Sequence, residues 1–91
     1  MKLMLIDYDL KAPGRNYNAL QEAIKASPGW WHYMESNWVV ATNETVRDLQ
    51  SKLNALIDAN DRLLIVDISN CEVGGWLPRD AWDWLKKNGA R

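Results

Sequence analysis

The sequence predicts an α+β domain in which a four-stranded antiparallel sheet carries two helices on one face, followed by a short C-terminal helix. Two observations predict it. Short apolar runs rich in β-branched and aromatic residues alternate with stretches whose apolar residues recur every three or four positions, in the order β-α-β-β-α-β. The 91 residues are 47% hydrophobic and 25% charged, an ordinary composition for one globular domain, which excludes a disordered tail and a multidomain enzyme.

The first strand and helix are predicted on either side of a Pro-Gly loop. Residues 3–10 form a short apolar run typical of a strand, and Pro13 and Gly14 follow it. Asn16 is suited to cap a helix over about residues 17–26, which the sequence Ser-Pro-Gly at 27–29 ends. The apolar stripe of this helix consists of Tyr17, Leu20 and Ile24.

A hairpin and a second helix are predicted next. Residues 30–35 and 38–42 are β-rich runs, separated by Ser36 and Asn37 as a tight turn. We expect Thr42 or Asn43 to cap the helix that follows. Its apolar stripe consists of Val46, Leu49, Leu53, Leu56 and Ile57.

The last strand and the C-terminal helix complete the pattern. Residues 62–68 are typical of a buried strand, and the turn at Gly74 and Gly75 follows. Pro78 suits the first turn of the last helix, and Gly89 suits the position just past its end. We therefore expect residues 1–70 to form the domain and residues 71–91 to form an extension that packs on the sheet or on a partner protomer.

The order β-α-β-β-α-β is that of the ferredoxin-like fold. Because β-α-β crossovers are right-handed, each such pair of strands is parallel and separated by an antiparallel strand. The predicted strand order is therefore 4-1-3-2, with both main helices on one face.

The chain contains six tryptophans, three tyrosines and no phenylalanine. Since neighbouring residues of a strand point to opposite faces, Trp30 and Trp31 cannot both enter one core. The second face of the sheet therefore needs a cover, because monomers rarely expose large apolar patches. The C-terminal helix, a second protomer or a stacked ligand could supply it. We expect a homodimer, with an aromatic interface that includes Trp30, Trp31, Trp76, Trp82 and Trp84.

Charge, cysteine content and hydropathy limit the classes of function. The net charge of −1 provides no strong field toward nucleic acid or an anionic membrane. A lone cysteine, Cys71, excludes an intramolecular disulfide and zinc-finger spacing. No apolar stretch is long enough to span a membrane or to act as a signal segment. We expect a cytoplasmic protein.

Two carboxylates near the end of the first strand form the candidate site. Asp7 and Asp9 lie two residues apart and therefore share a face of the strand. Paired carboxylates can hold a hard cation such as Mg²⁺, with Mn²⁺ as a substitute, and such a metal can activate water for attack on a phosphodiester. In the alternative interpretation the two aspartates cap the loop or pair with Lys11 or Arg15.

Phosphate-binding residues are expected beside this pair. Lys11, Arg15 and Asn16 lie between the strand and the N-terminus of the first helix, where an anion is favoured. The topology brings the hairpin and the start of the last strand to the same end of the sheet. Residues that could border the site are Glu35, Asn37, Asp61 and Arg62, whereas Asp67 lies at the far end.

The end of the first strand also carries a family resemblance. It reads Ile6-Asp7-Tyr8-Asp9-Leu10 and opens a β-α-β-β-α-β chain. In this the chain resembles the small CRISPR-associated ferredoxin-like endonuclease and spacer-integration subunits, and it is similar to the virulence-associated protein D ribonucleases. The resemblance covers residues 1–70. It departs from the family pattern in the second strand, at residues 30–33, and in the tryptophan-rich tail.

The resemblance implies a homodimer with the first-strand aspartates of both chains near the dyad. It implies either a metal-dependent nuclease or a non-catalytic scaffold that holds DNA. Asp9, which follows Tyr8, matches the family aspartate, and Arg15 lies where the families place basic residues. The sequence thus predicts a small nucleic-acid-processing protein that acts as a metal-dependent nuclease on RNA or DNA. The alternative is a non-catalytic homodimeric module that binds a protein or nucleic-acid partner.

Overall fold

Four strands and three helices make up the fold in the computed structural model, which describes residues 1–12 and 16–91. The sheet has the order β2-β3-β1-β4 with every neighbouring pair antiparallel. This is the predicted order read from the opposite edge, so the predicted α+β fold class is confirmed. The elements are β1 (Lys2–Asp9), α1 (Asn18–Lys25), β2 (Gly29–Met34), β3 (Asn37–Thr42), α2 (Val46–Asn54), β4 (Arg62–Asp67) and α3 (Arg79–Lys87).

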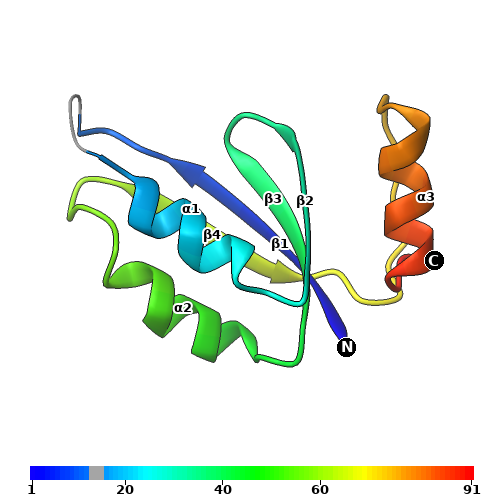
Figure 1. The fold of residues 1–91 in the computed structure, drawn as a ribbon, viewed down its shortest axis with the longest axis horizontal. Coiled ribbons are helices and arrows are strands. Elements are labelled where there is room, and N and C mark those ends of the chain that lie inside the picture. Colours follow the sequence, from blue (N-terminus) through cyan, green and yellow to red (C-terminus); the bar gives the residue numbers. More distant parts are fainter. Residues whose placement is uncertain (13–15) are drawn as a thin grey trace.

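The first face of the sheet is covered by α1 and α2 (Figure 1). Even-numbered residues of β1 point toward these helices, as the two-residue period of a strand requires. The core between them contains apolar side chains and one polar pair, in which the Trp38 indole Nε1 donates a hydrogen bond to the Tyr8 hydroxyl at 3.0 Å. Its buried members are Met4, Ile6, Tyr8, Leu20, Ile24, Trp38, Val40, Leu49 and Leu53.

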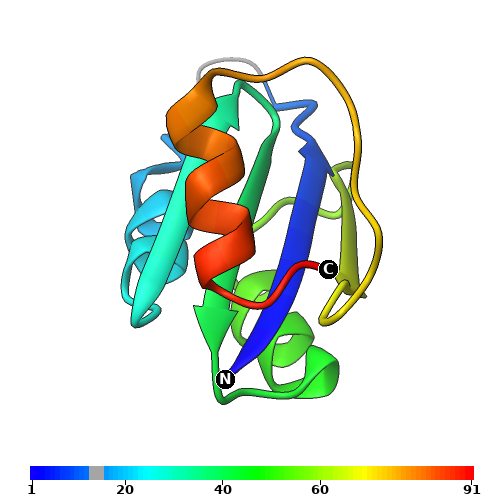
Figure 2. The ribbon, with the colours of Figure 1, turned by 90° about the vertical axis from the view of Figure 1, so that its right-hand side faces the viewer.

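The second face is covered by the chain's own α3, which lies over β2 and β3 while β4 stays outside the helix's cover (Figure 2). Ala81 and Leu85 of α3 pack on Leu3, Trp31 and Val39. The Trp31 indole Nε1 donates to the Ala81 carbonyl at 3.2 Å, so its buried polar atom is satisfied. The sequence allows the C-terminal helix, a second protomer or a stacked ligand to cover the second face. The structure shows that the C-terminal helix of the same chain covers part of it.

The predicted interface tryptophans divide into two groups. Trp31 is 4% exposed beneath α3 and belongs to the core, so its assignment to an interface is corrected. Trp82 and Trp84 of α3 are half-buried against the same core. Trp30 is exposed on the opposite face of β2, as strand alternation predicts, and Trp76 is 100% exposed in the loop before α3.

Several predicted boundaries differ from the structure, and α2 ends at Asn54, so Leu56 and Ile57 of its predicted stripe lie beyond the helix. The hairpin turn consists of Glu35 and Ser36, one residue earlier than predicted, because Asn37 already belongs to β3. The N-cap of α2 is Thr45, not Thr42 or Asn43. Thr45 Oγ1 accepts from the Asp48 N–H at 3.1 Å and the Asp48 carboxylate accepts from the Thr45 N–H at 3.0 Å, a reciprocal capping box.

The predicted end of α3 is confirmed, whereas the predicted N-cap of α1, Asn16, is wrong because Tyr17 occupies that position. The Asn16 side chain accepts from the Asn18 N–H at 2.9 Å, one residue before the N-cap position that Tyr17 occupies. Gly89 adopts φ +119° just past α3, where the Ala90 N–H donates to the Leu85 carbonyl and closes the helix. Within residues 1–12 and 16–91, no helix has both the length and the apolar character needed to cross a bilayer.

Candidate functional site

The two candidate carboxylates lie on the second face of the sheet, beyond the part that α3 covers. Odd-numbered residues of β1 share this face, since Leu3 and Leu5 pack in the α3 core. Asp7 is half-buried and Asp9, the last residue of β1, is exposed. The structure therefore places the pair on one face at one strand end, as the sequence predicts.

Asp7 has an amide side chain directly opposite on β3. In the β1–β3 register Asp7 faces Asn37. The Tyr8 N–H donates to the Ser36 carbonyl, so residues 8 and 36 form a hydrogen-bonded pair and residues 7 and 37 a non-hydrogen-bonded pair, in which side chains lie closer together. The Asn37 Oδ1 is buried without a hydrogen-bond partner. Among the described residues none donates a hydrogen bond to the Asp7 carboxylate.

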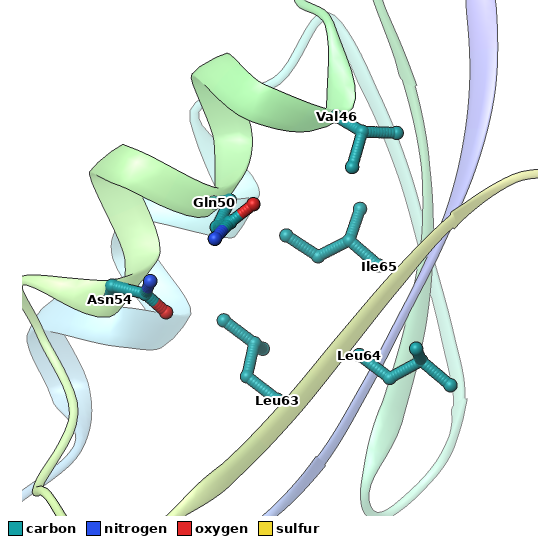
Figure 3. A pocket seen from close by; sticks show the side chains of 6 residues that line it. All are labelled: Val46, Gln50, Asn54, Leu63, Leu64 and Ile65. Atoms are coloured by element: carbon teal, nitrogen blue, oxygen red, sulfur yellow. The ribbon is translucent and has the colours of Figure 1, made fainter.

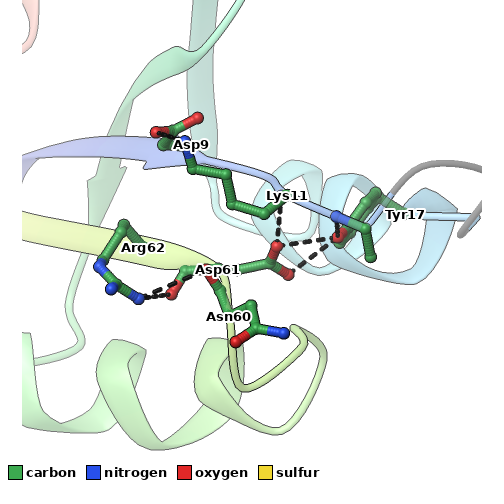
Figure 4. A network of polar contacts seen from close by, with 7 residues as sticks. Asp9, Lys11, Tyr17, Asn60, Asp61 and Arg62 are labelled. Atoms are coloured by element: carbon green, nitrogen blue, oxygen red, sulfur yellow. Dashed lines mark hydrogen bonds and ion pairs between the residues drawn. The ribbon is translucent and has the colours of Figure 1, made fainter.

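Asp9 has basic groups on two sides. Its carboxylate forms an ion pair with Lys11 Nζ at 2.8 Å, and Arg62 lies opposite Asp9 in the β1–β4 register (Figure 4). A shallow pocket of about 190 Å³ lies against the paired ends of β1 and β4. Its lining combines the two carboxylates, the Arg62 side chain and apolar residues: Asp7, Tyr8, Asp9, Arg62, Leu63 and Leu64.

A second carboxylate centre lies next to this pocket on the helix side. Asp61 is only 6% exposed and accepts hydrogen bonds from the Lys11 N–H at 2.6 Å and the Asp58 N–H at 2.7 Å. The Tyr17 hydroxyl lies 3.0 and 2.9 Å from its two oxygens (Figure 4). A buried carboxylate with these donors joins the segment after β1, the segment before α1 and the turn before β4. Its role is to hold the loops that carry Lys11 and Arg62.

The predicted phosphate-binding residues are only partly placed together. Lys11 is exposed beside Asp9, whereas the Asn16 side chain is engaged in its own helix start. Arg15 lies outside the described residues. Glu35 is exposed in the hairpin turn, and Asp67 lies opposite Met4, away from the site as expected. Hydrogen bonds from the side chain and then the backbone of Ser69 hold the pKa of Asp67 below its ordinary value.

His32 is a packed residue and not a base poised at this site. Its ring stacks on Trp38 with centroids 3.7 Å apart, and its Nδ1 lies 2.8 Å from the Asn37 carbonyl. Trp30 packs on the same indole at 5.5 Å, and Lys25 Nζ lies 5.5 Å from the centre of the Trp30 ring. This aromatic stack stiffens the hairpin that positions Asn37.

The oxygen atoms around Asp7 and Asp9 suit a weakly bound Mg²⁺ that keeps several water ligands. They do not form a site in which protein groups supply every ligand. In the described part of the chain, no group of three His, Cys, Asp or Glu side chains is arranged to hold a metal ion. Mg²⁺ commonly keeps several waters and uses only one or two carboxylates together with substrate phosphates. Asp7, Asp9 and the orphaned amide oxygen of Asn37 are the oxygen atoms here that could serve as ligands of this kind.

The chain has no match among models of known protein families, curated proteins or solved structures.

Proposed function

We propose that the chain is a small nucleic-acid-processing protein, a metal-dependent nuclease whose site is the Asp7–Asp9 end of β1. The observation that carries this proposal is the half-buried Asp7 carboxylate, which shares a face with Asp9 and lies opposite the unpartnered Asn37 oxygen. A half-buried carboxylate without a donor is costly unless a cation balances it. Mg²⁺, or Mn²⁺ in its place, would supply that charge.

The bound cation would polarise a phosphodiester and lower the pKa of a bound water. Asp7 and Asp9 would hold it. Coordination by Asp9 would break the ion pair with Lys11 and release that ammonium group for a phosphate oxygen. Arg62, across from Asp9, would bind the same backbone from the other side of the pocket.

The test measures cation binding and cleavage separately. We expect Mn²⁺ to bind the wild-type chain, seen by electron paramagnetic resonance, and Asp7→Asn or Asp9→Ala to abolish binding. Single-stranded and duplex RNA and DNA should be cut only with Mg²⁺ or Mn²⁺ and not by Asp9→Ala. Asp83→Ala, an exposed aspartate of α3, is the matched control and should leave both unchanged. Cleavage that survives Asp9→Ala, or no cleavage with any substrate, would refute the proposal.

A non-catalytic homodimeric module is the second candidate. It is supported by the apolar side chains that the fold leaves exposed, above all Trp76, which is 100% exposed, and Leu64, which is 59% exposed. A monomeric mass in light scattering at all concentrations tested would contradict it.

The resemblance to the CRISPR-associated subunits and the virulence-associated protein D ribonucleases enters as part of the same proposal. The support for it is the placement of Asp9 directly after Tyr8 at the end of β1. The exposed thiol of Cys71 suits a reducing compartment, so we propose a cytoplasmic protein.

A further inference from the structure

The β4 edge of the sheet is regular and open, unlike the β2 edge. The β2–β3 register shifts between Trp31 and Met34, an irregularity of the kind that blunts an edge strand. β4 instead pairs with β1 in unbroken register from Arg62 to Asp67, and it contains no proline and no lysine. Regular apolar edges of this kind are templates for a further strand.

The register identifies which backbone groups of β4 face outward. The Ile68 N–H donates to the Leu3 carbonyl at 2.8 Å, so residues 3 and 68 form a hydrogen-bonded pair. Because hydrogen-bonding direction alternates along a strand, residues 62, 64 and 66 bond to β1. The N–H and C=O groups of Leu63, Ile65 and Asp67 therefore point away from the sheet.

Both faces of this edge have room for the side chains of an added strand. On the helix side, a groove of about 350 Å³ runs between α2 and β4 (Figure 3). On the other face, the side chain of Leu64 points away from α2 (Figure 3), and Leu64 and Val66 are 59% and 38% exposed. The groove lining is uncharged: Val46, Gln50, Asn54, Leu63, Leu64 and Ile65.

We propose that the β4 edge binds the β4 edge of a second copy of this chain, antiparallel, about a two-fold axis at Ile65. This deepens the proposed homodimer and does not depend on the nuclease proposal. In this register Ile65 pairs with Ile65 of the second copy, and Leu63 with Asp67. Every outward N–H and C=O of the three residues then has a partner. Leu64 and Val66 meet Val66 and Leu64 of the second copy in non-hydrogen-bonded pairs, which covers the exposed apolar pair on each side.

The charge of the groove favours a second copy of the chain as its partner, and the charges along β4 favour an axis at Ile65 over one at Leu64. A surface that meets its own copy must not repel itself, and the groove lining carries no charge. The same absence of cationic side chains disfavours a nucleic-acid strand, which needs phosphate neutralisation. An axis at Leu64 would instead place Asp61 opposite Asp67 of the second copy, and the Asp61 N–H is already bonded to the Asp58 carbonyl. Like charges directly opposite each other destabilise a sheet.

The first test compares the two edges by multi-angle light scattering and analytical ultracentrifugation. We expect twice the chain mass of 10.5 kDa for the wild type. Leu64→Lys should weaken the dimer at least about tenfold, roughly the 1.4 kcal/mol expected when a charge replaces a buried leucine contact. Met34→Lys is the matched control, because Met34 is also exposed, at 46%, but lies on the β2 edge. A monomeric wild type, or a dimer lost in Met34→Lys and kept in Leu64→Lys, would overturn the proposal.

The second test reads the register. Leu64→Cys and Val66→Cys are made separately in a Cys71→Ser background, which removes the native thiol. Opposite residues of a non-hydrogen-bonded pair have Cα atoms about 4.5 Å apart, within disulfide range. Two Leu64 residues would be staggered by two positions and about 8 Å apart, beyond that range. We expect crosslinked dimer only when the two variants are mixed and oxidised. Crosslinks within either variant alone, or none in the mixture, would overturn the register whether or not the chain cleaves nucleic acid.

Discussion

Replacement of Asp61 should destabilise the fold far more than its position in a surface turn suggests. The carboxylate is 6% exposed and accepts short hydrogen bonds from two backbone N–H groups, at 2.6 and 2.7 Å, besides its contact with the Tyr17 hydroxyl. Hydrogen bonds to an ionised group contribute about 1.5–3 kcal/mol each and are not additive. Asp61→Ala also leaves two partly buried N–H donors without an acceptor, at about 1–3 kcal/mol each, so we expect a loss of about 3–5 kcal/mol.

Urea unfolding followed by tryptophan fluorescence measures this loss. For a chain of this size about 3 kcal/mol corresponds to a fall in Tm of at least about 12 °C. Asp83→Ala, on the exposed side of α3, should stay within about 0.5 kcal/mol of wild type. Tyr17→Phe removes only the hydroxyl and should cost about 1.5–3 kcal/mol, but much less in an Asp61→Asn background. A stability of Asp61→Ala within about 1 kcal/mol of wild type would refute the structural role of this carboxylate.

Other predictions concern the helix ends and the α3 cover. Thr45→Ala removes the N-cap of α2 and should cost about 1 kcal/mol in urea unfolding. Hydrogen bonds from the Thr45 backbone and then its side chain hold the pKa of Asp48 below its ordinary value, so this carboxylate stabilises the fold above the ordinary aspartate pKa. The stability gap between wild type and Asp48→Asn should therefore persist at neutral pH and close as the pH falls through the lowered pKa. Leu85→Ala should cost about 2–5 kcal/mol if α3 covers the sheet as described, and an unchanged stability would show that it does not. Gly89→Ala, at φ +119°, should cost about 1 kcal/mol or more in thermal unfolding, whereas Gly74→Ala meets open space and should not.

Local patterns predicted the elements that depend on local chemistry. The two-residue period of strands placed Trp30 and Trp31 on opposite faces, and Gly89 marked the end of α3. The predicted N-cap of α2 is wrong because Thr42 and Asn43, the first polar residues at the end of β3, precede the true cap, Thr45. The spacing of Thr45 and Asp48 three residues apart is the signal that would have identified it.

Tertiary contacts account for what the sequence left unresolved at the site. From the sequence, Asp61 is expected only to border the Asp7–Asp9 pair. Its hydrogen-bond network is not predicted because two of its donors, Lys11 and Tyr17, lie 50 and 44 positions away in the chain. No local pattern reports such a contact. The orphaned oxygen of Asn37 is hidden for the same reason, since its burial depends on the pairing of β3 with β1 thirty residues away in the chain.

The strip of the second face that α3 leaves uncovered follows β4 and the end of β1 (Figure 2). Asp7 and Asp9 lie on this end of β1, opposite Leu64 and Arg62 of β4. In a dimer joined through β4, the two β1 strands are three strand spacings apart, or roughly 14 Å. The two carboxylate pairs would then lie on one face of a continuous sheet, too far apart to share a metal ion. Calorimetry should accordingly find one divalent cation per chain. One cation per two chains would instead support the arrangement that the family resemblance implies, with both Asp9 carboxylates near the dyad, and would contradict association through β4.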